Sequence, residues 1–62
     1  MDYQNIDQLG IKPYQKIKLI FSDLYTTSGY FVKNTSKNIG ITTDKNFRLC
    51  SRIDIIKNIE LI

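Results

Sequence analysis

The sequence contains no histidine and a single cysteine, Cys50. Without histidine, a hydrolytic triad lacks its usual base and a transition-metal site lacks its commonest ligand. The acids Asp23, Asp44, Asp54 and Glu60 fall in separate predicted turns and segment ends, and the glycines form no phosphate-binding loop. We therefore expect no enzyme activity, no metal and no cofactor, with Cys50 acting as a small apolar side chain.

Long apolar runs are also missing. No stretch approaches the ~20 residues needed to span a bilayer, and residues 1–5 lack the basic and apolar regions of a signal peptide. One cysteine cannot form an intramolecular disulfide, so we expect a soluble, cytoplasmic protein. A chain of 62 residues makes one domain and removes only ~60% of its unfolded surface from water, which favours help from a partner subunit.

The clearest pattern is near the end of the chain. Ile53, Ile56 and Ile59 recur at intervals of three, and Leu61 follows at an interval of two. The first spacing is typical of a tight helical turn and the second of a strand. The sequence therefore predicts one turn near Asp54 and a final strand over residues 57–61.

Four further segments are rich in alternating, β-branched or aromatic residues, and they predict strands over residues 16–21, 25–33, 39–43 and 47–51. Gly29 lies within the second of them and predicts a sharp bend or a close backbone approach. A helix of about two turns is predicted within residues 7–13, with Gly10 as its stop. Residues 1–62 are thus expected to form an all-β, five-stranded, strongly bent small barrel (15–62) behind a short N-terminal helical segment (1–14).

Alternation assigns the apolar side chains to two faces. Residues expected inside the barrel are Ile17, Leu19, Phe21, Phe31, Ile39, Ile41, Phe47, Leu49, Ile53, Ile56 and Ile59. Ile20, Tyr30, Val32, Cys50 and Ile55 are then left outside, and the first four are the candidate interface residues. Ile6, Leu9 and Ile11 or another copy of the chain could cover them; alternatively, the bent strands mix their faces.

The net charge of +3 slightly favours a polyanionic partner. Lys45, Arg48 and Arg52 lie around one predicted hairpin, and Lys37 and Asn38 lie in the neighbouring turn. These are the candidate nucleic-acid-binding residues, with Tyr14, Tyr25 and Tyr30 available to stack on bases. The alternative is a solvated face of extended basic side chains.

Residues 52–59 resemble the second motif of the Sm-like proteins, an Arg-Gly-Asp-Asn-type turn before the closing strand. Arg52 and Asp54 match that motif, whereas Ile53 occupies the place of its glycine. Residues 17–38 are similar to the first Sm motif, with Gly29 at the bend and a polar turn ending at Asn38, although the usual turn glycine is replaced at position 24. The resemblance covers roughly residues 16–61.

This resemblance implies a bent five-stranded barrel that assembles edge to edge into a ring and binds single-stranded RNA through its two turns. It assigns the base contacts to Asn38 and Arg52. The Tyr-Lys-His segment of the bacterial Hfq branch is not reproduced, since Cys50, Ser51 and Arg52 lie in that region.

Two hypotheses of function follow. The first is a homo-oligomeric Sm-like barrel that binds RNA or another single-stranded nucleic acid without catalysis. The second is a protein-interaction module, such as one from a phage or mobile element, that docks a partner protein through a strand edge or through the outward surface of Ile20, Tyr30 and Val32.

Overall fold

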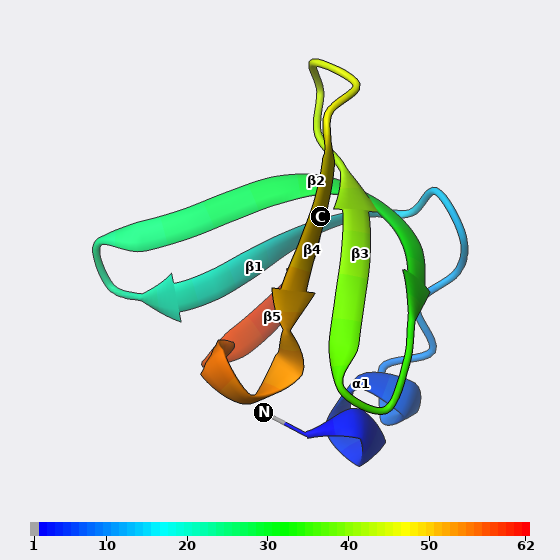
Figure 1. Cartoon of the computed structure of the whole chain (residues 1–62), viewed down its shortest axis with the longest axis vertical. Helices are drawn as coiled ribbons and strands as arrows, with labels where there is room; N and C mark the ends of the chain where they lie inside the picture. The colour runs from blue at the N-terminus through cyan, green and yellow to red at the C-terminus, as the bar shows by residue number, and fades with distance from the viewer. Residues whose placement is uncertain (1) are drawn as a thin grey trace.

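The computed structural model describes residues 2–62. Its elements in chain order are α1 (Tyr3–Gln8), β1 (Lys16–Ser22), β2 (Tyr25–Asn34), β3 (Asn38–Thr42), β4 (Arg48–Arg52), the 3₁₀ turn η1 (Ile53–Ile55) and β5 (Asn58–Leu61). The strands form one antiparallel sheet in the order β4-β3-β2-β1-β5 (Figure 1). The predicted all-β, five-stranded architecture is confirmed. The sheet is not closed, however, because β4 and β5 are its two edge strands.

Strand β2 serves both halves of the sheet. Its first half pairs with β1 as far as Tyr30, and its second half, from Tyr30 to Asn34, pairs with β3. The register with β3 shifts between Phe31 and Lys33, so the strand is irregular there. Figure 1 shows the result: the β1–β2 hairpin extends to one side, while β3 and β4 run steeply across it.

At Gly29 the β2 backbone passes very close to β3. A Cβ atom added at this glycine would meet the backbone carbonyl oxygen of Thr42 at 2.6 Å, a distance that real Cβ contacts do not reach. The predicted close backbone approach at Gly29 is therefore confirmed. The irregularity in the ladder lies two residues further on, at Phe31.

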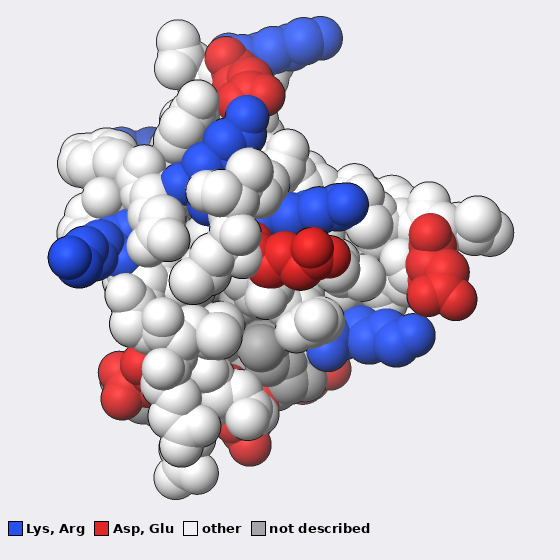
Figure 2. Space-filling view, turned by 180° about the vertical axis from the view of Figure 1, so that it is seen from behind, with Lys and Arg blue, Asp and Glu red and all other residues white. Residues whose placement is uncertain are grey.

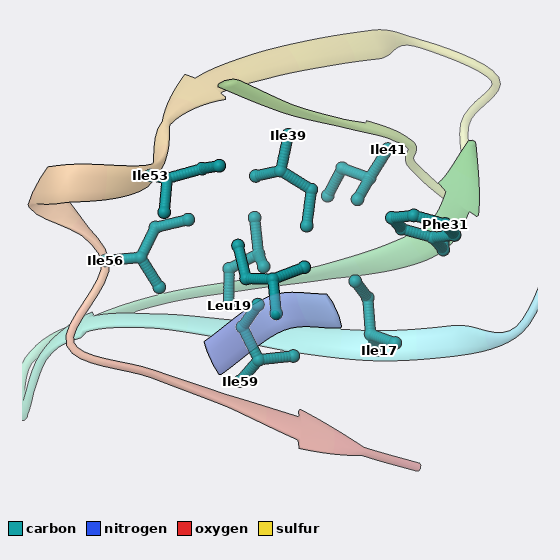
Figure 3. Close-up of a cluster of buried hydrophobic side chains, with 9 residues drawn as sticks. Ile17, Leu19, Phe31, Ile39, Ile41, Ile53, Ile56 and Ile59 are labelled. Carbon is teal, nitrogen blue, oxygen red and sulfur yellow. The ribbon is translucent and has the colours of Figure 1, made fainter. Parts of the chain in front are cut away.

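A cluster of buried apolar side chains fills the concave side of the sheet (Figure 3). The buried residues are Ile6, Ile17, Leu19, Phe31, Ile39, Ile41, Ile53, Ile56 and Ile59. Eight of these nine are residues that alternation and spacing assign to the interior, and the ninth, Ile6, comes from α1. Leu9 and Ile11 also pack against this cluster, so the N-terminal segment contributes to the core, whereas it was predicted to cover the outward apolar residues.

Three residues predicted to be in the core are not fully buried. Phe47 is 66% exposed because β4 begins one residue later than predicted, which leaves this ring in the loop before the strand. Leu49 pairs with the buried Ile41 and so faces the inner side, yet it is 43% exposed. The reason is that β4 is an edge strand with no further strand beside it. Phe21 is only partly buried.

The helix begins earlier than the predicted range of residues 7–13. The Asp2 carboxylate accepts a hydrogen bond from the Asn5 backbone N–H at 2.9 Å, and the Asn5 side chain accepts one from the Asp2 N–H at 3.4 Å. This capping box fixes the start of α1. Gly10, with φ 63°, follows the C-cap Leu9 in the left-handed conformation expected of a helix stop.

The predicted turn near Asp54 is confirmed as η1, which is closed by a 3.1 Å hydrogen bond from the Ile56 N–H to the Ile53 carbonyl oxygen. Within residues 2–62, no helix has the length and apolar character needed to cross a membrane.

The contact at Gly29 gives a stability prediction. Gly29→Val should lower the free energy of unfolding by about 1–3 kcal/mol, because the new side chain must displace the β3 backbone at Thr42. Gly40→Ala is the matched control: a Cβ there would meet its nearest atom at 3.7 Å. Urea unfolding followed by circular dichroism measures both. Equal stability of Gly29→Val and the parent would contradict the close approach.

Candidate nucleic-acid interface

The β3–β4 hairpin positions most of the predicted site residues. Asn38 lies directly opposite Arg52 at one end of the ladder, and Thr42 lies opposite Arg48 at the other. Four residue steps at ~3.3 Å each separate the two ends by roughly 13 Å. The structure therefore brings Asn38 and Arg52 together and places Arg48 away from them.

At the first end, the β2–β3 turn and η1 are joined by backbone contacts. The Lys37 carbonyl oxygen accepts a 2.9 Å hydrogen bond from the Ile53 N–H. Within the turn, the Thr35 hydroxyl accepts hydrogen bonds from the N–H groups of Lys37 and Asn38, at 3.3 and 3.1 Å. Lys37, Asn38 and Arg52 thus lie on one fixed surface, which we call the two-turn surface.

Arg52 also has an intramolecular partner. Its guanidinium donates to the Asp54 carboxylate at 2.5 Å, and the two side chains are 71% and 60% exposed. An ion pair this exposed contributes little to stability and exchanges readily for another anion. Arg52 is therefore free to turn toward a phosphate or a base, although Asp54 offsets part of its charge.

The other predicted basic residues form a second group at the β3–β4 loop. Hydrogen bonds close this loop, from the Thr43 N–H to the Phe47 carbonyl oxygen at 2.8 Å and from the Phe47 N–H to the Thr43 hydroxyl at 3.2 Å. Lys45 lies in the loop beside Asp44, and Arg48 begins β4. Lys45 and Arg48 therefore lie at the opposite end of the β3–β4 hairpin from Asn38 and Arg52.

The candidate interface residues do not form one patch. Val32 and Cys50 line a shallow hollow of about 200 Å³ over Gly40, whose missing side chain leaves the space open. Tyr30 lies two residues before Val32 on β2. Ile20 lies four residues along β1 from Lys16, the residue opposite Tyr30, so it is remote from the other three.

Sequence reasoning missed an apolar groove between β4 and the β1–β2 hairpin. Its volume is about 510 Å³, and its lining residues are Leu19, Phe21, Tyr25, Thr27, Leu49, Cys50, Ser51 and Ile55. The Phe21 and Tyr25 rings meet edge to face on its wall, with centroids 5.3 Å apart. The predicted outward position of Ile55 indicates such a groove. The prediction of a closed barrel, however, assigned Leu49 and Phe21 to the interior and left no exposed apolar surface beside Ile55.

Among residues 2–62, no three His, Cys, Asp or Glu side chains come together as metal ligands would. No family model matches the chain, and comparisons with curated proteins and with solved structures found no match. The resemblance to Sm-like proteins therefore stays a prediction, and proposals of function depend on the geometry of this chain.

The exposed Arg52–Asp54 pair predicts that Arg52→Ala is structurally mild. Its free energy of unfolding should stay within about 0.5 kcal/mol of the parent, because exposed ion pairs are weak. Chemical denaturation measures this difference. A loss above about 1.5 kcal/mol would mean that Arg52 is a structural residue and is unsuited to a binding role.

Proposed function

We propose that this chain binds single-stranded RNA, without catalysis, at the two-turn surface. The observation that carries the proposal is the direct opposition of Asn38 and Arg52 on β3 and β4. The Asn38 amide offers both donors and an acceptor to a base edge, and the planar Arg52 guanidinium can stack on a base or donate to it. Lys37, exposed beside them, supplies a phosphate contact.

The charge distribution favours binding of nucleic acid at a small site over binding along a broad basic surface. On the side seen in Figure 2, basic and acidic side chains lie interspersed in the upper and middle part, and the charged side chains at the bottom are acidic. A net charge of +3 also gives only modest attraction to a polyanion. Specific contacts at Asn38 and Arg52 must then provide most of the affinity.

The binding prediction separates base contacts from phosphate contacts. Arg52→Ala and Asn38→Ala should each weaken binding by about 1–3 kcal/mol and reduce any base preference. Lys37→Ala should instead weaken all sequences alike and lower the salt dependence by about one unit. Fluorescence anisotropy with short oligo-A, oligo-U and DNA of the same length measures these effects.

Asp54→Asn is the control variant for which we expect tighter binding of nucleic acid. Removing the carboxylate paired with Arg52 should strengthen binding, whereas Asp23→Asn, at the exposed Asp23–Lys57 pair on the β1–β2 turn, should leave it nearly unchanged. Two results would contradict the proposal. One is parent binding weaker than about 100 μM at low salt, and the other is equal affinity for the parent and Arg52→Ala.

A second proposal concerns self-association, since both edges of the sheet are open. The β4 edge borders the apolar groove, and the other edge, β5, ends at the exposed Leu61 and is followed by the exposed Ile62. An edge strand beside an apolar groove is suited to strand addition, and repeated addition of β5 to β4 would build a ring or filament. We propose a second copy of the chain as the occupant; a different protein is the alternative.

The groove predicts how this association can be blocked. Ile55→Lys places a charge in the groove and should convert an oligomer at micromolar concentration into a monomer, as measured by analytical ultracentrifugation. Leu24→Lys is the control, because Leu24 is almost fully exposed at the β1–β2 turn and does not line the groove. A monomeric parent across that concentration range would exclude self-association and favour a different protein partner.

A further inference from the structure

The strand registers align four residues in a single row across the sheet. Lys16 lies opposite Tyr30, Tyr30 opposite Thr42, and Thr42 opposite Arg48, so the row crosses β1, β2, β3 and β4. Residues directly opposite on neighbouring strands share one face and lie ~5 Å apart. We call Lys16, Tyr30, Thr42 and Arg48 the cross-strand row.

The row lies on the outer face of the sheet. Each of the first three residues has a neighbour in the chain that is buried in the core: Ile17 for Lys16, Phe31 for Tyr30 and Ile41 for Thr42. Because side chains alternate along a strand, the residues of the row point away from the core. Tyr30 is 38% exposed and Arg48 is exposed, while Lys16 and Thr42 are half-buried.

The chemistry of the row suits a nucleotide. The Lys16 ammonium lies 5.9 Å from the centre of the Tyr30 ring. Tyr30 and Arg48 lie two strands apart, about 10 Å, on either side of the short Thr42 side chain. A base can therefore stack on Tyr30 or on the Arg48 guanidinium with its edge toward the Thr42 hydroxyl, while phosphates contact the basic groups.

Acidic groups do not interrupt the row. On the β1 side, Glu60 lies opposite Lys18 and is therefore already beside a basic residue. At the other end, Asp44 lies next to Lys45 in the β3–β4 loop. These neighbours leave the charges of Lys16 and Arg48 available to a phosphate.

The same outer face connects the row to the two-turn surface. Along β3 and β4, the Asn38–Arg52 pair, the Gly40–Cys50 pair and the Thr42–Arg48 pair follow one another at two-residue intervals. Because side chains alternate, all three pairs project to one face. Gly40 and Cys50 of the middle pair line the hollow together with Val32 and Arg48, and the two end pairs lie roughly 13 Å apart along the strands.

We propose that the outer face of β3 and β4 is a track for single-stranded nucleic acid, with a second base-stacking contact at Tyr30 in the cross-strand row. Arg48, Lys16 and the nearby Lys45 bind phosphates at this end, and the hollow over Gly40 admits the backbone or a base between the two contacts. The track takes the same ligand as the two-turn surface and in that respect depends on the proposed function.

The test uses oligo-U and oligo-A of about ten nucleotides, a length within the usual site sizes for such surfaces. Anisotropy titrations compare the parent with Tyr30→Ala, Arg52→Ala and the double variant. Tyr30→Ala should weaken binding about 5- to 100-fold, which is the usual range for loss of one stacked base. Tyr30→Phe should keep near-parent affinity, because the ring is retained. Leu24→Ala, at the exposed β1–β2 turn and outside the row, should change affinity less than about twofold.

Two further variants keep the test valid if Tyr30→Ala destabilises the fold. Arg48→Gln removes an exposed charge of the row and should weaken binding and lower its salt dependence. Gly40→Leu fills the hollow, where a Cβ has room, and should block the path without affecting the pairing of Asn38 with Arg52.

The outcomes distinguish the two proposals. Weakening by Arg52→Ala but not by Tyr30→Ala, Arg48→Gln or Gly40→Leu would overturn the track and leave the two-turn surface as the site. Weakening by Tyr30→Ala and Arg48→Gln but not by Arg52→Ala would support the contact at Tyr30 and overturn the proposed site. No effect of any variant would overturn both.

Discussion

The close approach of β2 to β3 at Gly29 is the constraint on which the rest of the structure depends. Only a residue without a Cβ lets the two backbones come this near, since any side chain would meet the Thr42 carbonyl oxygen. Because β2 can follow this path, it pairs first with β1 and then with β3, and the sheet curves around its isoleucine-rich core. The same path accompanies the β2–β3 register that places Tyr30 opposite Thr42, while the β3–β4 hairpin places Asn38 opposite Arg52.

The open sheet divides the surface of the protein into parts with different chemistry. The concave side is filled by the core and extends into the apolar groove beside β4, which suits an apolar partner. The convex side of β3 and β4 carries Asn38, Arg48 and Arg52, which suit a polyanion. The proposed binding of nucleic acid and the proposed association through the strand edges therefore involve different sides of the sheet, and the two proposals do not exclude each other.

The sequence patterns predicted the helices and strands more accurately than they predicted which side chains those elements leave exposed. The three-residue spacing of Ile53, Ile56 and Ile59 predicts η1 and β5 because it reports which side chains must be buried together. Alternation alone cannot reveal whether a strand has a neighbour on each side, so Leu49 on the β4 edge was wrongly expected in the core. The start of α1 depends on the Asp2 and Asn5 capping box, a polar signal that hydrophobic spacing does not contain. The resemblance to the two Sm motifs led us to expect Asn38 and Arg52 close together, and they lie opposite each other. The cross-strand row, in contrast, depends on the pairing of β2 with β3, and the irregularity after Phe31 determines that pairing.

The central claim is that the turn containing Lys37 and the turn following Arg52 act as one RNA-binding surface. Amide chemical shifts of ¹⁵N-labelled protein, recorded by NMR during titration with a short oligo-U, test it most directly. The account predicts that the largest shifts occur at the amides of Asn38, Arg52 and Ile53, since these groups lie on the surface or in the contact that joins the two turns. Largest shifts at Tyr25 and Leu49 in the apolar groove, or no shifts along β3 and β4, would contradict it.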